Sequence, residues 1–216
     1  MWALVESNNV TQVYTRPKAL TIGDVNYPSN IFMLWSSSEL EAIGIYEIVI
    51  DNSNLKDKEY YINTNQSFAF KSSVTINSID YTNVVVASYG VATAKPLDDV
   101  LWQEGDEDMP EGTSVGDVKT PGIRQGHKDT INSQAGGTLQ STDWMVVRAA
   151  EGGTAVPSDI ATWRAAVRTK SNDMCTAIDS AADVDALAAL YTYTNTGTEE
   201  SPVYTRPLGE FPELGA

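Results

Sequence analysis

The segment QEGDEDMPEGTSVGDVK (residues 103–119) separates two parts of the sequence that differ in character. Acidic residues stand there among glycine and proline, which is typical of an exposed connecting segment. We therefore predict an acidic linker at 103–119, between a β-rich domain at 1–102 and a helical domain at 120–193. A calcium or partner site in this acidic run is the less favoured interpretation. The chain returns to extended character at 194–216, with a polar stretch from Thr194 to Ser201, which predicts an extended C-terminal arm.

Before this segment, short runs of β-branched and aromatic residues alternate with glycine, proline, asparagine and aspartate. Their regular spacing predicts a small sandwich-like or barrel-like sheet. Within it, SSSELEAIG (residues 36–44) predicts a short capped helix that ends at Gly44 in a left-handed conformation. The predicted strands are 2–5, 10–15, 19–22, 45–50, 60–63, 67–70, 74–79 and 83–89.

After the segment the pattern becomes helical. Thr120-Pro121 predicts a helix that ends at Gly136-Gly137, and a second helix follows from Ser141 to Gly152-Gly153. A third begins at Ser158, and a last short helix begins near Ser180. The fold class is therefore α+β, with a helical hairpin or bundle after the β-rich part. The third helix carries an apolar stripe of Ile160, Trp163, Val167, Met174 and Ile178, whereas Arg164, Arg168 and Lys170 are predicted to face water.

The formal net charge of −15 argues against a nucleic-acid partner, because the few basic residues are scattered and form no patch. We interpret the negative charge as serving solubility, in preference to forming an acidic docking surface. No apolar run approaches the roughly 20 residues that cross a bilayer, so we expect no membrane insertion. The first residues lack the features of a secretory signal, and the single cysteine forms no intramolecular disulfide; both fit folding in a cytoplasm.

Residues with catalytic chemistry are scarce. His127 is the only histidine, so any Ser-His-Asp or Cys-His mechanism would need it, and Cys175 lies in an amphipathic helix. The cluster Asp51–Asn54 is interpreted as a turn rather than a cation site. We therefore predict no catalytic residues, no metal site and no cofactor. A catalytic pair of carboxylates that are far apart in the sequence stays open as an alternative, because only the fold determines their separation.

Aromatic residues crowd the N-terminal half, and some of them should face a partner. Tyr60 and Tyr61 are adjacent in a predicted strand, so at least one is a candidate for partner binding. VYTRP occurs twice, at 13–17 and 203–207, either as two equivalent extended segments or by chance. Tyr204 and Arg206, in the second copy, are further candidates for partner contacts.

Several stretches resemble small tail-region virion proteins of marine tailed phages. In the first half they are MWALVE (1–6), YPSNIF (27–32) and ELEAIGIY (39–46). In the second half, TDWMVVR (142–148), then Val156-Pro157 and WRAAVR (163–168), is similar to a helical segment of phage tail-fibre and tail-assembly proteins. The resemblance implies a particle component without catalytic residues, and marks Trp144, Trp163, Arg164 and Arg168 as partner-binding candidates.

The leading hypothesis is thus a non-enzymatic virion structural protein of the tail region: an adaptor, a fibre base or tip, or a decoration protein. It would be made in the host cytoplasm and contact other virion proteins as a homo-oligomer or within a ring. One alternative is a tail-fibre assembly chaperone, which would need an exposed apolar groove on its helical half. Another is a carbohydrate-binding or carbohydrate-degrading tip module, which would place exposed Trp or Tyr beside paired carboxylates.

Overall fold

The computed structural model describes residues 1–215 and divides the chain into two compact units, Met1–Thr93 and Ala94–Ala216. The first unit carries a β-sheet and the second carries the long helices, which confirms the predicted α+β class and its order. The boundary follows Thr93, whereas the sequence predicted it after residue 102. Residues 103–119 lie within the helical unit, so this segment does not link the two units.

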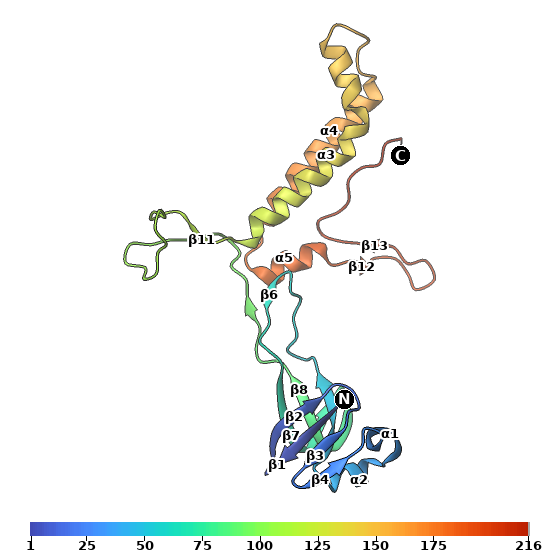
Figure 1. The fold of residues 1–216 in the computed structure, drawn as a ribbon. Helices are drawn as coiled ribbons and strands as arrows, with labels where there is room; N and C mark the ends of the chain where they lie inside the picture. Colours follow the sequence, from blue (N-terminus) through green and yellow to red (C-terminus); the bar gives the residue numbers. More distant parts are fainter. Residues whose placement is uncertain (216) are drawn as a thin grey trace. The chain divides into compact units, whose positions relative to one another are not determined.

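The first unit is built around a five-stranded sheet in the order β2-β1-β5-β8-β7 (Figure 1). Neighbouring strands are antiparallel except β5 and β8, which are parallel, with Ile48 opposite Val85. The strands are β1 (Trp2–Glu6), β2 (Asn9–Tyr14), β5 (Ile45–Asp51), β7 (Ser67–Ile76) and β8 (Ile79–Ser88).

All five strands of the sheet contribute side chains to one apolar cluster on one face, so the sheet is strongly curved around it. Its edge strands β2 and β7 approach each other, but the sheet is not a closed barrel. The buried members are Ala3, Ile48, Val85 and Ala87, with Val5, Val10, Val13, Tyr46, Phe68 and Phe70 packed against them.

The opposite face is covered at β1, β2 and β5 by a small hairpin, β3 (Leu20–Ile22) and β4 (Val25–Tyr27), and two short helices, α1 (Ile31–Leu34) and α2 (Ser37–Glu41). Ser36 and Glu39 form a capping box at the start of α2, and Gly44 has φ +82°, as predicted for this short helix. The buried residues here are Leu4, Tyr14, Leu20, Ile31, Phe32, Leu40 and Ile45.

The predicted strands 67–70 and 74–79 are wrong in their limits, because β7 is one strand that ends at Ile76. Asn77 and Ser78 both have positive φ, 52° and 65°, which is the backbone of a tight hairpin turn. Ile79, predicted to end a strand, therefore begins β8. Two short strands complete this part of the chain, β6 (Tyr61–Ile62) and β9 (Thr93–Ala94).

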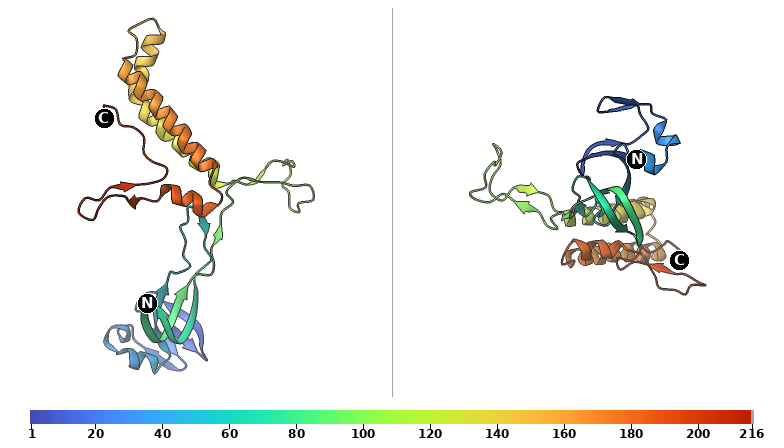
Figure 2. Two further views of the ribbon diagram at one scale, coloured as in Figure 1. Left: turned by 180° about the vertical axis from the view of Figure 1, so that it is seen from behind. Right: turned by 90° about the horizontal axis from the view of Figure 1, so that it is seen from below.

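The second unit is dominated by two long helices that run side by side as a hairpin, α3 (Ile123–Ala150) and α4 (Ser158–Asp179) (Figure 2). A short helix, α5 (Val184–Tyr191), follows. One face of each long helix is buried: His127, Ile131, Ala135 and Thr142 on α3, and Ile160, Arg164, Val167, Ser171, Met174 and Ile178 on α4.

The prediction that a helix ends at Gly136-Gly137 is wrong, because α3 continues through both glycines to Ala150. Each glycine costs about 1 kcal/mol relative to alanine inside a helix. The buried face continues on either side of them, from Ile131 and Ala135 to Thr142, and its packing outweighs that cost. The prediction that Arg164 faces water is also wrong, since its side chain packs inward with only 5% exposed.

Two short ribbons extend the second unit. In the first, β10 (Val100–Leu101) pairs with β11 (Val118–Thr120), so the predicted acidic linker is the loop of a hairpin. In the second, β12 (Thr194–Asn195) pairs with β13 (Tyr204–Thr205). The chain after this ribbon is packed rather than a free arm, because Leu208 is buried and its amide donates to the carbonyl of Leu190.

Candidate functional site

A concavity of the first unit lies where β8 separates from β5. Parallel pairing of the two strands runs from Ile48 to Asp51 on β5, opposite Val85 to Ser88 on β8. Before these residues, Ile45 and Glu47 on one side and Thr82 to Val84 on the other line a hollow of about 320 Å³. We call it the β5–β8 hollow.

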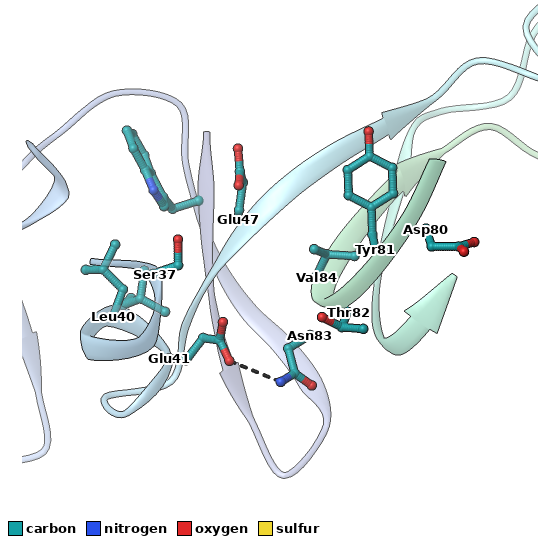
Figure 3. Close-up of a pocket in the computed structure, with 11 residues that line it drawn as sticks. Ser37, Leu40, Glu41, Glu47, Asp80, Tyr81, Thr82, Asn83 and Val84 are labelled. Carbon is teal, nitrogen blue, oxygen red and sulfur yellow. Dashed lines mark hydrogen bonds between the residues drawn. The ribbon is translucent and has the colours of Figure 1, made fainter. Parts of the chain in front are cut away.

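Asn83 marks the point of separation. Its φ is 51°, a left-handed conformation that is uncommon for a residue other than glycine and that locally interrupts a strand. From this position its side-chain amide donates to Oε2 of Glu41, at the end of α2, over 3.1 Å (Figure 3). This hydrogen bond joins β8 to the α2 side of the hollow.

Three carboxylates line the β5–β8 hollow: Glu41 from α2, Glu47 from β5 and Asp80 from β8. Asp80 accepts a hydrogen bond from the hydroxyl of Thr75 over 2.6 Å. Figure 3 shows Glu47 between the α2 residues and Tyr81.

Two aromatic residues, Trp2 and Tyr81, also line the hollow. The Trp2 ring is supported from outside by Phe32, with ring centroids 4.8 Å apart. None of the eleven lining residues is Lys, Arg or His. Glu47 and Asp80 are exposed, so the lining of the hollow is acidic and open to solvent.

Sequence reasoning missed this site. The one local signal is Asn83, a polar turn-forming residue directly before the Val-Val-Val run of a strand. No local pattern connects Glu41 and Glu47 with Asp80, because their proximity depends on the parallel pairing of β5 with β8. Among residues 1–215, no group of three or more His, Cys, Asp or Glu is placed to hold a metal ion.

Tyr60 and Tyr61, two predicted partner-binding residues, lie elsewhere in the first unit and do not line the hollow. Tyr60 is buried, with 7% exposed, and its amide donates to the carbonyl of Asp57. Tyr61 is half-buried in β6, with the ammonium of Lys56 at 5.8 Å from its ring centroid. Of the two, Tyr61 is the better placed to meet a partner.

Arg164 and Trp163 are held by contacts within the second unit. Arg164 reaches across from α4 to α3, where it donates to the carbonyl of Leu139 over 2.9 Å and to Oδ1 of Asp143 over 2.7 Å. Trp163 donates its indole N–H to the carbonyl of Pro212 over 2.9 Å, which fixes the C-terminal segment along α4. Both residues therefore have a structural part in this unit.

The remaining candidates are more accessible. Trp144 on α3 is 55% exposed, with the guanidinium of Arg148 at 4.9 Å from its ring, and Arg168 is exposed on α4. Tyr204 in β13 is 63% exposed. Arg206 is half-buried, paired with Glu210 at 2.8 Å and 5.2 Å from the ring of Tyr193.

The two copies of VYTRP have different environments. Tyr14 is almost fully buried in the sheet of the first unit, whereas Tyr204 is exposed on a two-stranded ribbon. Both segments are extended, but their tyrosines pack differently.

No known protein family matches the chain, and no curated protein or solved structure shows significant similarity to it. No helix within residues 1–215 is both long and apolar enough to cross a membrane.

Proposed function

We propose that this chain is a non-enzymatic structural protein that acts through contacts with other proteins, and that it belongs to the tail region of a phage particle. The observation that carries the proposal is the pair of ribbons in the second unit, β10/β11 and β12/β13. Each is a two-stranded hairpin whose strand residues are all exposed.

An isolated two-stranded hairpin is at best marginally stable in water, because it buries too little apolar surface. These ribbons nevertheless present large apolar side chains, with Val118 49% and Tyr204 63% exposed. Contact with a neighbouring protein would bury these side chains and complete the hydrogen bonding of the ribbon edges. The ribbons are therefore suited to act as docking arms.

The chemistry of the single cysteine supports a role without covalent catalysis. Burial raises the pKa of the Cys175 thiol, which disfavours the reactive thiolate. His127, the only histidine, lies with its Nδ1 3.0 Å from the hydroxyl of Tyr191. This contact between α3 and α5 accounts for the buried histidine without a catalytic role.

The phage assignment is supported by the resemblance of residues 1–6, 27–32, 39–46, 142–148, 156–157 and 163–168 to tail-region, tail-fibre and tail-assembly proteins of phages. Such proteins assemble by surface burial within rings or symmetric oligomers. The partners would be other virion proteins or further copies of this chain, in the finished particle.

A second candidate function, a tail-fibre assembly chaperone, is favoured by one observation. Trp144 and Val147 are both 55% exposed on the same face of α3, one helical turn apart. This apolar patch could cover part of an unfinished fibre. A chaperone of this kind would be absent from the finished particle.

The experiment is complementation of a phage that lacks the gene by variants of this chain. In the arm variant, Val118→Ser removes the apolar side chain that is 49% exposed on β11 and leaves the hydrogen bonds between Trp102 and both Gly116 and Asp117 in place. The matched control is Val91→Ser, which changes an apolar residue that is 82% exposed outside the arms. We expect the control chain to enter particles and the arm variant, although folded, to be excluded. Equal incorporation of both would contradict a docking role for this ribbon.

A further inference from the structure

We propose that the end of α3 around Arg148 receives the acidic loop of the β10/β11 ribbon (residues 103–117) from a second copy of this chain. The inference rests on the proposed function, because it names the surface on which one of the docking arms would bind. We call Trp144, Val147 and Arg148 the α3 end patch.

The side chain of Arg148 lacks hydrogen-bond partners. Its Nε is, among residues 1–215, the one buried side-chain nitrogen or oxygen without a hydrogen bond. The guanidinium forms no ion pair within these residues either, although Glu151 follows directly after the helix. A buried donor without an acceptor is unfavourable, and more so in a charged group. Arg148 therefore has unused capacity to bind a carboxylate.

The rest of the α3 end patch is apolar and open to solvent. Trp144 and Val147 are both 55% exposed, and their spacing places them on one face of the helix. The guanidinium of Arg148 lies over the Trp144 ring, 4.9 Å from its centroid. A guanidinium stacked in this way keeps N–H groups at its edge for a carboxylate, and Trp and Arg are the residue types that contribute most to protein interfaces. The patch thus suits a partner that presents carboxylates beside apolar side chains.

The loop of the β10/β11 ribbon has this complementary chemistry. Four of its carboxylates are exposed and form no hydrogen bond or ion pair with the described part of the chain: Glu104, Glu107, Asp108 and Glu111. Val115 in the same loop is 60% exposed. A charge-assisted hydrogen bond from Arg148 would relieve the repulsion among the carboxylates, and an apolar side chain of the loop would cover Trp144.

The ribbon and the patch belong to opposite ends of α3. The segment that leads into the ribbon is fixed at the start of this helix, where the amides of Ile123 and Arg124 donate to the carbonyls of Pro96 and Leu97. At 1.5 Å per residue, the helix axis from Ile123 to Arg148 is about 38 Å long. The loop of the same chain therefore starts from the far end of the helix, and a second copy is the occupant that brings loop and patch together.

A contact of this kind joins different surfaces of the two copies. Each copy offers one loop and one patch, so every bound copy leaves a further loop and a further patch free. Such head-to-tail contacts close into rings or continue as filaments. The inference therefore specifies how copies of this chain would assemble around a ring.

The test mixes two variants of the full chain, each of which lacks one half of the contact. The patch variant is Arg148→Gln, and the loop variant carries Glu104→Gln, Glu107→Gln and Glu111→Gln. We expect the unaltered chain to self-associate in analytical ultracentrifugation at about 100 μM, and each variant alone to associate at least tenfold more weakly.

An equimolar mixture of the two variants should form dimers and no larger species, because the patch variant keeps its loop and the loop variant keeps its patch. Far-UV circular dichroism checks that both are folded. A mixture that associates no better than its components, or an unaltered chain that is monomeric at this concentration, would overturn the proposal.

Arg168→Gln is the matched control for Arg148→Gln. Arg168 is exposed on α4 and has no hydrogen bond or ion pair with the residues that the structure describes. Its replacement changes the net charge by the same amount and should alter association less than twofold. Equal effects of the two variants would show that net charge controls association, and would reject the α3 end patch.

The result can be separated from that of particle complementation. If the unaltered chain is monomeric while the Val118→Ser chain is still excluded from particles, the ribbon docks on another virion protein. That outcome rejects the second copy as its partner and leaves the docking role of the ribbon intact.

Discussion

Arg164 on α4 and Asp143 on α3 form an ion pair, with Nη2 and Oδ1 2.7 Å apart. The guanidinium is buried, whereas the side chain of Asp143 is 54% exposed. The same guanidinium also donates to the carbonyl of Leu139 and to the hydroxyl of Thr142. The two long helices are therefore joined by polar contacts at this point of their interface, and Ser171 of α4 donates a further hydrogen bond to Asn132 of α3.

We predict that Asp143→Ala lowers the free energy of unfolding of the helical unit by about 1–2 kcal/mol, because it leaves a buried guanidinium without its counter-charge. The double variant Arg164→Met with Asp143→Ala should recover part of this loss, since a methionine needs no counter-charge. The free energy of unfolding of both variants is measured by urea titration, with far-UV circular dichroism as the signal. A double variant less stable than Asp143→Ala alone would contradict this interpretation of the pair.

Arg124, in the first turn of α3, caps the C-terminus of α4. It donates to the carbonyls of Ile178, over 2.7 Å, and Ala181, over 3.2 Å, and pairs with Asp98 at 2.7 Å. Carbonyls at a helix C-terminus lack partners within the helix, and a cation also complements the helix dipole. Arg124→Ala should therefore cost about 2–3 kcal/mol in the same unfolding measurement.

Lys128→Ala is the matched control for Arg124→Ala. It removes an ion pair with Asp179, at 2.9 Å, whose acidic partner is half exposed. We expect a loss below about 1 kcal/mol, as for other surface pairs. Equal losses for the two variants would mean that Arg124 acts as an ordinary surface charge.

The glycines inside α3 should be replaceable with a gain in stability. A Cβ at Gly136 or Gly137 would have no heavy atom within 4 Å, so alanine should add about 0.5–1 kcal/mol at each position by raising helix propensity. Gly122→Ala should have the opposite effect, because its Cβ would lie 2.3 Å from the carbonyl carbon of Asp98. Thermal unfolding of the three variants measures these changes, and a loss at Gly136 and Gly137 would contradict the solvent-exposed placement of that face.

The pKa of the Tyr193 phenol can be tested by titration at alkaline pH. Its hydroxyl donates to the carboxylate of Glu210, and this hydrogen bond raises the pKa of the phenol above its usual value near 10. Since the folded pKa lies above the unfolded one, the contact contributes fully below about pH 10 and is lost as pH rises through the folded pKa. Tyrosinate absorbance, taken as the difference from Tyr193→Phe, should show this raised pKa.

Glu210→Gln should lower the pKa of Tyr193 toward its usual value, because the amide oxygen is a weaker acceptor without charge. An unchanged pKa in this variant would show that the carboxylate does not control the phenol.

Features of the fold that depend on neighbouring residues could be predicted from the sequence. The pattern Ser36, Glu39 and Gly44 gave the correct short helix, because capping and a left-handed stop use residues a few positions apart. Ser158 was correctly placed at the start of α4 for the same reason, with a stripe in which Val167, Met174 and Ile178 are buried.

Features that depend on distant residues could not be predicted. Arg164 looked like a solvent-facing charge, since its partners Leu139, Thr142 and Asp143 belong to another helix. The β5–β8 hollow was missed for the same reason, because Glu47 and Asp80 come to line one hollow only through the parallel pairing of β5 with β8. Glycine pairs are a local pattern, yet they predicted a helix end correctly at only one of two places. Gly152 follows the end of α3, whereas Gly136-Gly137 lies inside the helix.

The most direct test of the central claim is quantitative mass spectrometry of purified particles of the phage that encodes this chain, with its copy number measured against the major tail protein. A structural component docked through its ribbons should be present at a fixed multiple of three, five, six or twelve copies per particle. If the chain occurs only in the lysate of infected cells, bound to a fibre protein and absent from particles, it is not a virion component and the chaperone function replaces the one proposed.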